Sequence, residues 1–204
     1  MRASTRAEFV AGPAGRIECA VDGPESSDGS QRIGIALIAH PHPLYGGTLD
    51  NKVVQTLARA FVELGYEAWR PNFRGVGKTE GVHDEGRGEL EDLAAIVAHL
   101  KPARLALAGF SFGAGVQVML AQRVKAEKLV LVGVAVTRFQ LPTVQAGTLV
   151  IHGEQDETVP LATVLDWARP QDLRVVVIPG ADHFFHRKLN ILRELVRTHC
   201  AGAH

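Results

Sequence analysis

The stretch from Arg104 to Val124 reads RLALAGFSFGAGVQVMLAQRV and is the part of the sequence that decides the fold. Its apolar start, residues 105–108, is typical of a strand that is buried on both faces. Apolar residues then recur at helical spacing from Val116 onward, which predicts a helix. Between the two lies GFSFG, residues 109–113. We therefore expect a sharp turn from strand to helix with a serine at its apex.

The pattern G-x-S-x-G between a strand and a helix is typical of a nucleophile elbow around Ser111. Glycines at positions 109 and 113 let strand and helix approach closely, and the start of the helix presents free N–H groups beside the hydroxyl. The pentapeptide alone also fits an ordinary Gly/Ser turn, and the flanking strand and helix favour the nucleophile.

The composition predicts a single soluble domain over residues 1–204. The chain is 46% hydrophobic and 22% charged, and its 22 basic and 22 acidic residues balance, which argues against nucleic acid or an anionic membrane as the partner. The N-terminus has no apolar segment of a signal peptide. Cys19 and Cys200 are expected to be unpaired thiols in a reducing cytoplasm, with a bridge between them as the alternative.

Strands and helices alternate along the chain after an initial pair of strands. This order predicts an α/β fold: a doubly wound, mostly parallel sheet with an N-terminal antiparallel hairpin, helices on both faces and no lid domain. The expected strands cover residues 6–10, 16–21, 33–39, 66–70, 105–108, 128–134, 148–152 and 173–178. The expected helices, the first capped by Asp50 or Asn51, cover residues 51–64, 89–100, 112–124, 160–168 and 184–199.

A serine needs a base and an orienting acid to act as a nucleophile. In parallel sheets the reacting groups gather at the carboxyl ends of the strands. Asp156 follows the strand over 148–152, and His183 follows the strand over 173–178. The chain order Ser111, Asp156, His183 is the order expected of a triad in such a sheet.

Other residues near these loops compete for the same roles. His186 is a second candidate base, but His183 lies in the loop that faces the serine. Asp182 is expected to cap the following helix, and Glu154 and Glu157 to be solvated. No Cys or carboxylate cluster completes a metal site, so we expect no metal.

The segment HPHPLYGG, residues 40–47, follows the central strand and is expected to supply an oxyanion-hole donor beside the Phe112 N–H. Pro41 and Pro43 have no N–H. The second donor is therefore His42 or Leu44, and we favour Leu44. The two histidines of this segment are expected to be structural.

The loop NFRGVGKT, residues 72–79, contains GKT but lacks the first glycine of a phosphate-binding loop and is not followed directly by a helix. Its glycines are expected to serve a tight path near the site. His83, a little further along, is expected to be a surface residue.

The motifs around Ser111, Asp156 and His183 resemble those of the α/β-hydrolases, over nearly the whole chain. NFRGVGKT resembles the RGxGxS segment of that family, with Thr79 in place of the serine. HPHPLYGGTLDNKVV, residues 40–54, is similar to a subgroup of small lidless bacterial serine hydrolases, at least one of which behaves as a carboxylesterase.

This resemblance implies a serine esterase that cleaves small-molecule carboxylic esters through an acyl-enzyme, without a cofactor. An acyl-thioesterase is the nearest alternative. A ligand-binding receptor or interaction module on a hydrolase fold is an alternative of another class. A homodimer is compatible with so small a hydrolase.

Overall fold

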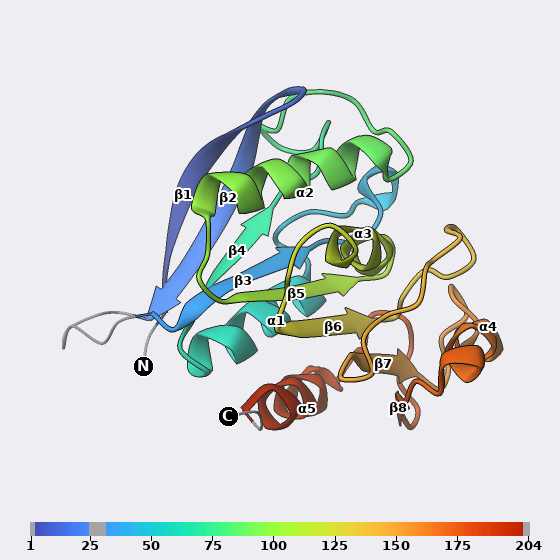
Figure 1. Cartoon of the computed structure of the whole chain (residues 1–204). Helices are drawn as coiled ribbons and strands as arrows, with labels where there is room; N and C mark the ends of the chain where they lie inside the picture. Colours follow the sequence, from blue (N-terminus) through green and yellow to red (C-terminus); the bar gives the residue numbers. More distant parts are fainter. Residues whose placement is uncertain (1–2, 25–31, 202–204) are drawn as a thin grey trace.

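The computed structural model describes residues 3–24 and 32–201, which build one eight-stranded sheet in the order β1-β2-β4-β3-β5-β6-β7-β8 (Figure 1). β1 and β2 form an antiparallel hairpin, β2 pairs antiparallel with β4, and all further pairs are parallel. The expected mixed sheet with an N-terminal hairpin is confirmed. The strands are β1 (Ala3–Gly12), β2 (Gly15–Pro24), β3 (Gly34–Ala39), β4 (Tyr66–Pro71), β5 (Leu105–Phe110), β6 (Lys128–Val132), β7 (Leu149–Gly153) and β8 (Val175–Ile178).

Helices cover both faces of this sheet (Figure 1). The longer ones are α1 (Lys52–Glu63), α2 (Arg87–Leu100), α3 (Phe112–Ala121), α4 (Leu161–Ala168) and α5 (Leu189–Ala201), and the single 3₁₀ turns are η1 (Pro43–Tyr45) and η2 (Arg169–Gln171). α1 and α5 pack together on one face, and α2 and α3 pack together on the other. In the part of the chain described, no helix is both long and apolar enough to cross a membrane.

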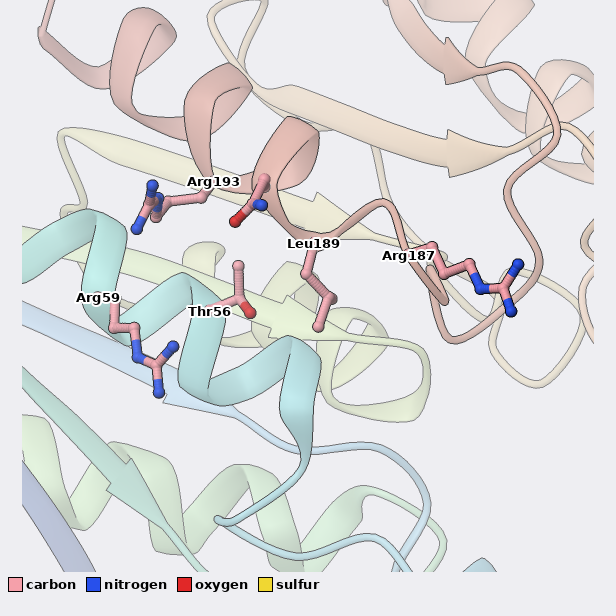
Figure 2. Close-up of a pocket in the computed structure, with 6 residues that line it drawn as sticks. Thr56, Arg59, Arg187, Leu189 and Arg193 are labelled. Carbon is pink, nitrogen blue, oxygen red and sulfur yellow. The ribbon is translucent and has the colours of Figure 1, made fainter.

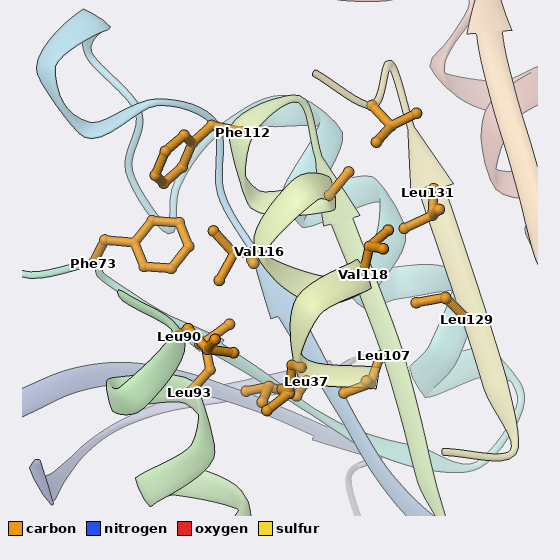
Figure 3. Close-up of a cluster of buried hydrophobic side chains, with 14 of the residues drawn as sticks. Leu37, Phe73, Leu90, Leu93, Leu107, Phe112, Val116, Val118, Leu129 and Leu131 are labelled. Carbon is orange, nitrogen blue, oxygen red and sulfur yellow. The ribbon is translucent and has the colours of Figure 1, made fainter. Parts of the chain in front are cut away.

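The central strands are apolar on both faces, as the alternation of their side chains requires. Leu37 and Leu107 lie in the cluster of side chains under α2 and α3, part of which is drawn in Figure 3. Their neighbours Ala36 and Ala108 point to the other face and pack with α1 and α5. The sheet therefore separates two cores.

Local signals explain where α1 begins and ends. The Asn51 side chain accepts hydrogen bonds from the Val53 and Val54 N–H groups at 2.9 and 3.4 Å, which satisfies two donors of the first turn. Gly65 follows the helix with a φ of 91°, a conformation that favours glycine. The predicted cap at position 50 or 51 is thus confirmed as Asn51.

The two cysteines are buried free thiols in different cores. Cys19 lies in the cluster under α2 and α3, and Cys200 lies in the cluster under α1 and α5. A bridge between them would have to cross the sheet.

The last helix begins later than predicted. α5 starts at Leu189 rather than near residue 184. Phe185 and Arg187 have φ angles of 56° and 61°, which a right-handed helix cannot include. The Asp182 carboxylate accepts the His186 N–H at 3.0 Å and closes a turn there. The expectation that Asp182 caps a helix is therefore wrong.

Candidate active site

Ser111 occupies the turn between β5 and α3 in a strained conformation, with φ 55° and ψ −116°. The flanking glycines make this turn possible. A Cβ on Gly109 would lie 2.6 Å from the Ala114 nitrogen, and one on Gly113 would lie 2.5 Å from the Ala39 carbonyl oxygen. Strand and helix thus approach so closely that no larger residue fits, as the elbow motif predicts.

His183 stands between the serine and an acid. Its Nε2 lies 3.1 Å from the Ser111 Oγ, and its Nδ1 lies 2.6 Å from the Asp156 Oδ2. All three residues are less than a tenth exposed. The structure therefore brings the three side chains predicted from the sequence into one hydrogen-bonded series.

Asp156 is held as a charged acceptor. Its Oδ1 accepts the Thr158 and Val159 N–H groups at 2.9 and 2.8 Å. Burial works to raise the pKa of Asp156, yet the hydrogen bonds from His183 and the Val159 amide hold that pKa below its usual value. A carboxylate in this state favours the tautomer of His183 that carries its proton on Nδ1.

His152 packs beside this carboxylate and was not singled out from the sequence. It is fully buried, and its Nε2 lies 2.8 Å from the Val159 carbonyl oxygen. Burial lowers the pKa of His152. A neutral ring that donates to Val159 supports the acid loop without adding a charge beside Asp156.

His186 does not reach the serine. Its side chain is 73% exposed, and its Nδ1 lies 2.6 Å from the Asp182 Oδ2. Of the two histidines considered as the base, the structure brings only His183 to Ser111.

The backbone N–H groups of His42 and Phe112 lie in adjoining segments. The first turn of α3 packs directly on the end of β3, and the rings of these two residues have centroids 4.8 Å apart. Neither N–H donates to another group among the described residues. The Leu44 N–H, in contrast, donates to the His42 Nδ1 at 3.2 Å. The preference for Leu44 as the second donor is thus not supported, because a ring nitrogen already accepts its proton.

His40 joins the two loops that flank the serine. Its Nε2 accepts the Phe73 N–H at 2.9 Å, and its Nδ1 lies 2.6 Å from the Pro41 carbonyl oxygen. Burial lowers the pKa of His40 to about 4, so the ring stays neutral. The structural role expected for this histidine agrees with its contacts.

The glycine-rich loop after β4 is held by its own side chains. The Thr79 hydroxyl donates to the Asn72 carbonyl oxygen at 2.9 Å, and Gly75 and Gly77 have positive φ angles. Arg74 forms two hydrogen bonds with Asp92 of α2, at 2.8 and 2.7 Å. The loop follows the tight path that its glycines predict.

The side chain of His83, in the segment between this loop and α2, is turned inward and is not exposed on the surface. Its side chain is only 7% exposed and its ring lies 4.8 Å from the ring of His42, centroid to centroid. The expectation of a surface residue is wrong, because the loop folds back over α3. Glu89 is the residue that could have indicated this from the sequence, because its carboxylate binds the backbone of this loop at the start of α2.

Two hollows lie near the elements described above. An open groove of about 630 Å³ runs along the acid loop and includes Asp156, His183 and Phe184 in its lining. Another hollow, of about 300 Å³, lies between α1 and α5, and Figure 2 shows its residues. It is lined by Thr56, Arg59, Arg187, Leu189, Asn190 and Arg193, so no triad residue lines it.

Fold and site together define a class: a sheet with a serine elbow, a histidine and an acid at the ends of successive strands, and no lid inserted among the described residues. A lidless α/β serine hydrolase from Xanthomonas campestris is 38% identical, with a TM-score of 0.87, and the match covers 98% of this chain and 94% of that one. A serine hydrolase homologue from Coxiella burnetii is 39% identical over 95% of this chain and 96% of that one, with a TM-score of 0.82.

An uncharacterized protein of Rickettsia prowazekii is 34% identical over an alignment of 201 positions, and the match covers 88% of this chain and 82% of that protein. No family model matches the chain. The chain belongs to the α/β serine hydrolases without a lid.

Proposed function

We propose that the protein hydrolyses carboxylic esters, with Ser111 as nucleophile, His183 as general base and acid, and Asp156 as the residue that orients the imidazole. The observation that carries this proposal is the hydrogen-bonded series from the Asp156 Oδ2 through both nitrogens of His183 to the Ser111 Oγ.

In the proposed mechanism the Ser111 Oγ attacks the ester carbonyl carbon while His183 Nε2 takes the hydroxyl proton. The imidazolium keeps its Nδ1–H on Asp156, whose negative charge stabilises it. The tetrahedral intermediate then collapses, and His183 passes its proton to the departing alkoxide. Water attacks the acyl-enzyme with the same histidine as base, which releases the acid and restores the serine.

The oxyanion of each tetrahedral intermediate is proposed to bind the N–H groups of Phe112 and His42. Two features support this pair: both groups lack an acceptor among the described residues, and their segments pack together at the start of α3. The N-terminus of α3 adds a partial positive charge on the same side.

Apolar side chains at the rim favour an ester with a short or exposed acyl group. Phe184 is 47% exposed, and its ring lies 5.2 Å from that of His183, while Tyr45 is 75% exposed, and its ring lies 4.6 Å from that of His42. Such a rim offers apolar contact without enclosing a long chain.

The test is hydrolysis of a p-nitrophenyl ester series of increasing acyl length, with matched thioesters alongside. We expect turnover with a short-chain optimum that Ser111→Ala abolishes while the circular dichroism spectrum stays unchanged. Wild-type rates in Ser111→Ala would refute the assigned nucleophile. A steep preference for thioesters over matched oxygen esters would instead make the protein a thioesterase.

A further inference from the structure

Two histidines from distant segments meet beside the nucleophile helix. His42 lies in the loop after β3, and His83 lies in the loop between β4 and α2. Both rings pack against Phe112, with centroids 4.8 and 5.5 Å from its ring. The His42 residue and the His83 side chain are each 7% exposed. The pair is therefore a buried part of the molecule.

Each of these rings has a nitrogen without a partner. The Nε2 atoms of His42 and His83 are both buried, and neither forms a hydrogen bond among the described residues. Leaving a buried polar atom without a hydrogen bond destabilises the folded state. Two such atoms in the same place are available to bind a ligand.

Glu85 adds a third group at this point. Its Oε1 lies 3.3 Å from the His83 Nε2, and the ligand atoms of His42, His83 and Glu85 all lie within 4.8 Å of one another. Ligand atoms with bonds of ~2.0–2.2 Å to a shared zinc ion lie closer together than this, so binding requires the side chains to move inward. The Glu85 side chain is 68% exposed and is able to make that movement.

A buried carboxylate orients His83 from behind. The Glu89 Oε1 lies 2.8 Å from the His83 Nδ1, and this side chain is completely buried. The same carboxylate accepts the N–H groups of Asp84 and Gly86. An acceptor at Nδ1 leaves the lone pair of His83 on Nε2, which is the arrangement that carboxylates give to metal-binding histidines.

We propose that His42, His83 and Glu85 bind a divalent transition-metal ion, with Zn²⁺ as the favoured ion. Two imidazole nitrogens and one carboxylate oxygen suit this ion, and water would complete the coordination. Burial lowers the pKa of His42, and the positive charge of Arg138 lowers it further. The negative charges of Glu85 and Glu89 act on this pKa in the opposite direction. The ion itself takes no part in the proposed ester chemistry, although the backbone N–H of His42 is also the proposed oxyanion donor, and the binding of the ion is measured without an activity assay.

Metal binding would change the turn at the rim of the active site. The Leu44 N–H donates to the His42 Nδ1, so without metal the proton of that neutral ring lies on Nε2. Coordination through Nε2 moves this proton to Nδ1, and the ring stays neutral. The Leu44 N–H then loses its acceptor, so we expect η1 to shift when the ion binds.

The experiment is a titration of metal-free protein with Zn²⁺, followed by calorimetry and by competition with a chromophoric chelator. We expect one ion per wild-type chain, no binding at this site in His83→Ala, and a loss of affinity of about tenfold or more in Glu85→Gln. His186→Ala is the matched control, because His186 is an exposed histidine that also pairs with a carboxylate. Its affinity should equal that of the wild type.

Nuclear magnetic resonance gives an independent readout. Zn²⁺ should shift the Leu44 amide resonance of the wild type, and the shift should be clearly smaller in Glu85→Gln at the same subsaturating concentration. Absence of stoichiometric binding, binding that neither His83→Ala nor Glu85→Gln weakens, or a Leu44 resonance that does not move at saturation would overturn the proposal. If His83→Ala fails to fold, the exposed Glu85→Gln decides the question.

Discussion

Replacing Asp156 by asparagine tests the proposed mechanism at the residue farthest from the substrate. The Asp156 Oδ1 accepts two backbone N–H groups, and its Oδ2 faces the His183 Nδ1 at 2.6 Å. An asparagine keeps its carbonyl oxygen on the two amides and therefore turns its NH₂ group toward Nδ1. That nitrogen must then be the acceptor, and the ring proton moves to Nε2, where it blocks proton transfer from Ser111.

The expected effect on catalysis is large, and the effect on stability is small. A wrong histidine tautomer lowers kcat by about 10⁴-fold in the well-known serine protease triad, which corresponds to about 5 kcal/mol in the activation free energy. In the folded protein the substitution replaces one charged hydrogen bond by a neutral one, which should lower the free energy of unfolding by only ~1–2 kcal/mol. Asp156→Asn should thus be folded and nearly inactive.

The assay measures kcat/KM for p-nitrophenyl acetate together with urea denaturation of each variant. Glu157→Gln is the matched control, since this exposed carboxylate lies in the same loop, and its kinetics should equal those of the wild type. A decrease of less than tenfold in folded Asp156→Asn would refute the role given to this acid.

Three further changes test the packing around the site. Gly113→Ala places a Cβ 2.5 Å from the Ala39 carbonyl oxygen. This should lower the free energy of unfolding by ~1–3 kcal/mol, measured as a lower midpoint of urea denaturation. An unchanged midpoint would contradict the close approach. Arg74→Ala leaves the buried Asp92 unpaired and should cost ~3–5 kcal/mol, seen as a lower Tm. The unfolded chain protonates His40 near pH 6.5 and the folded chain only near pH 4. Unfolding therefore takes up a proton in this window, and urea denaturation should show stability falling from pH 6.5 to 4, by up to ~3 kcal/mol, with a shallower fall in His40→Gln.

Much of the fold could be predicted because its signals are local. Apolar runs identify the parallel strands, and Asn51 and Gly65 bound α1 through contacts within a few residues. The start of α5 could not be predicted, because residues 184–188 are compatible with a helix. The turn that Asp182 closes and the positive φ of Phe185 keep these residues out of the helix.

The candidate triad was also accessible from the sequence, because each residue follows a strand whose end can be located. The grouping of side chains around Phe112 could not be predicted. His42 and His83 are 41 positions apart in the numbering, and only the folding of the loop after β4 brings their rings together. The hydrogen bond from the Leu44 N–H could not be predicted either, because it depends on the orientation of the His42 ring, which the spacing of the residues does not specify.

The backbone of Ser111 implies a compromise between activity and resistance to unfolding. A φ of 55° with a ψ of −116° costs any residue with a Cβ ~1–3 kcal/mol, and alanine at this position would keep that cost. Glycine would relieve it, with a smaller opposing loss of ~0.4–1 kcal/mol from the greater freedom of its unfolded chain. Ser111→Gly should therefore unfold at a higher urea concentration than Ser111→Ala, and the native protein gives up stability to hold its hydroxyl toward the substrate.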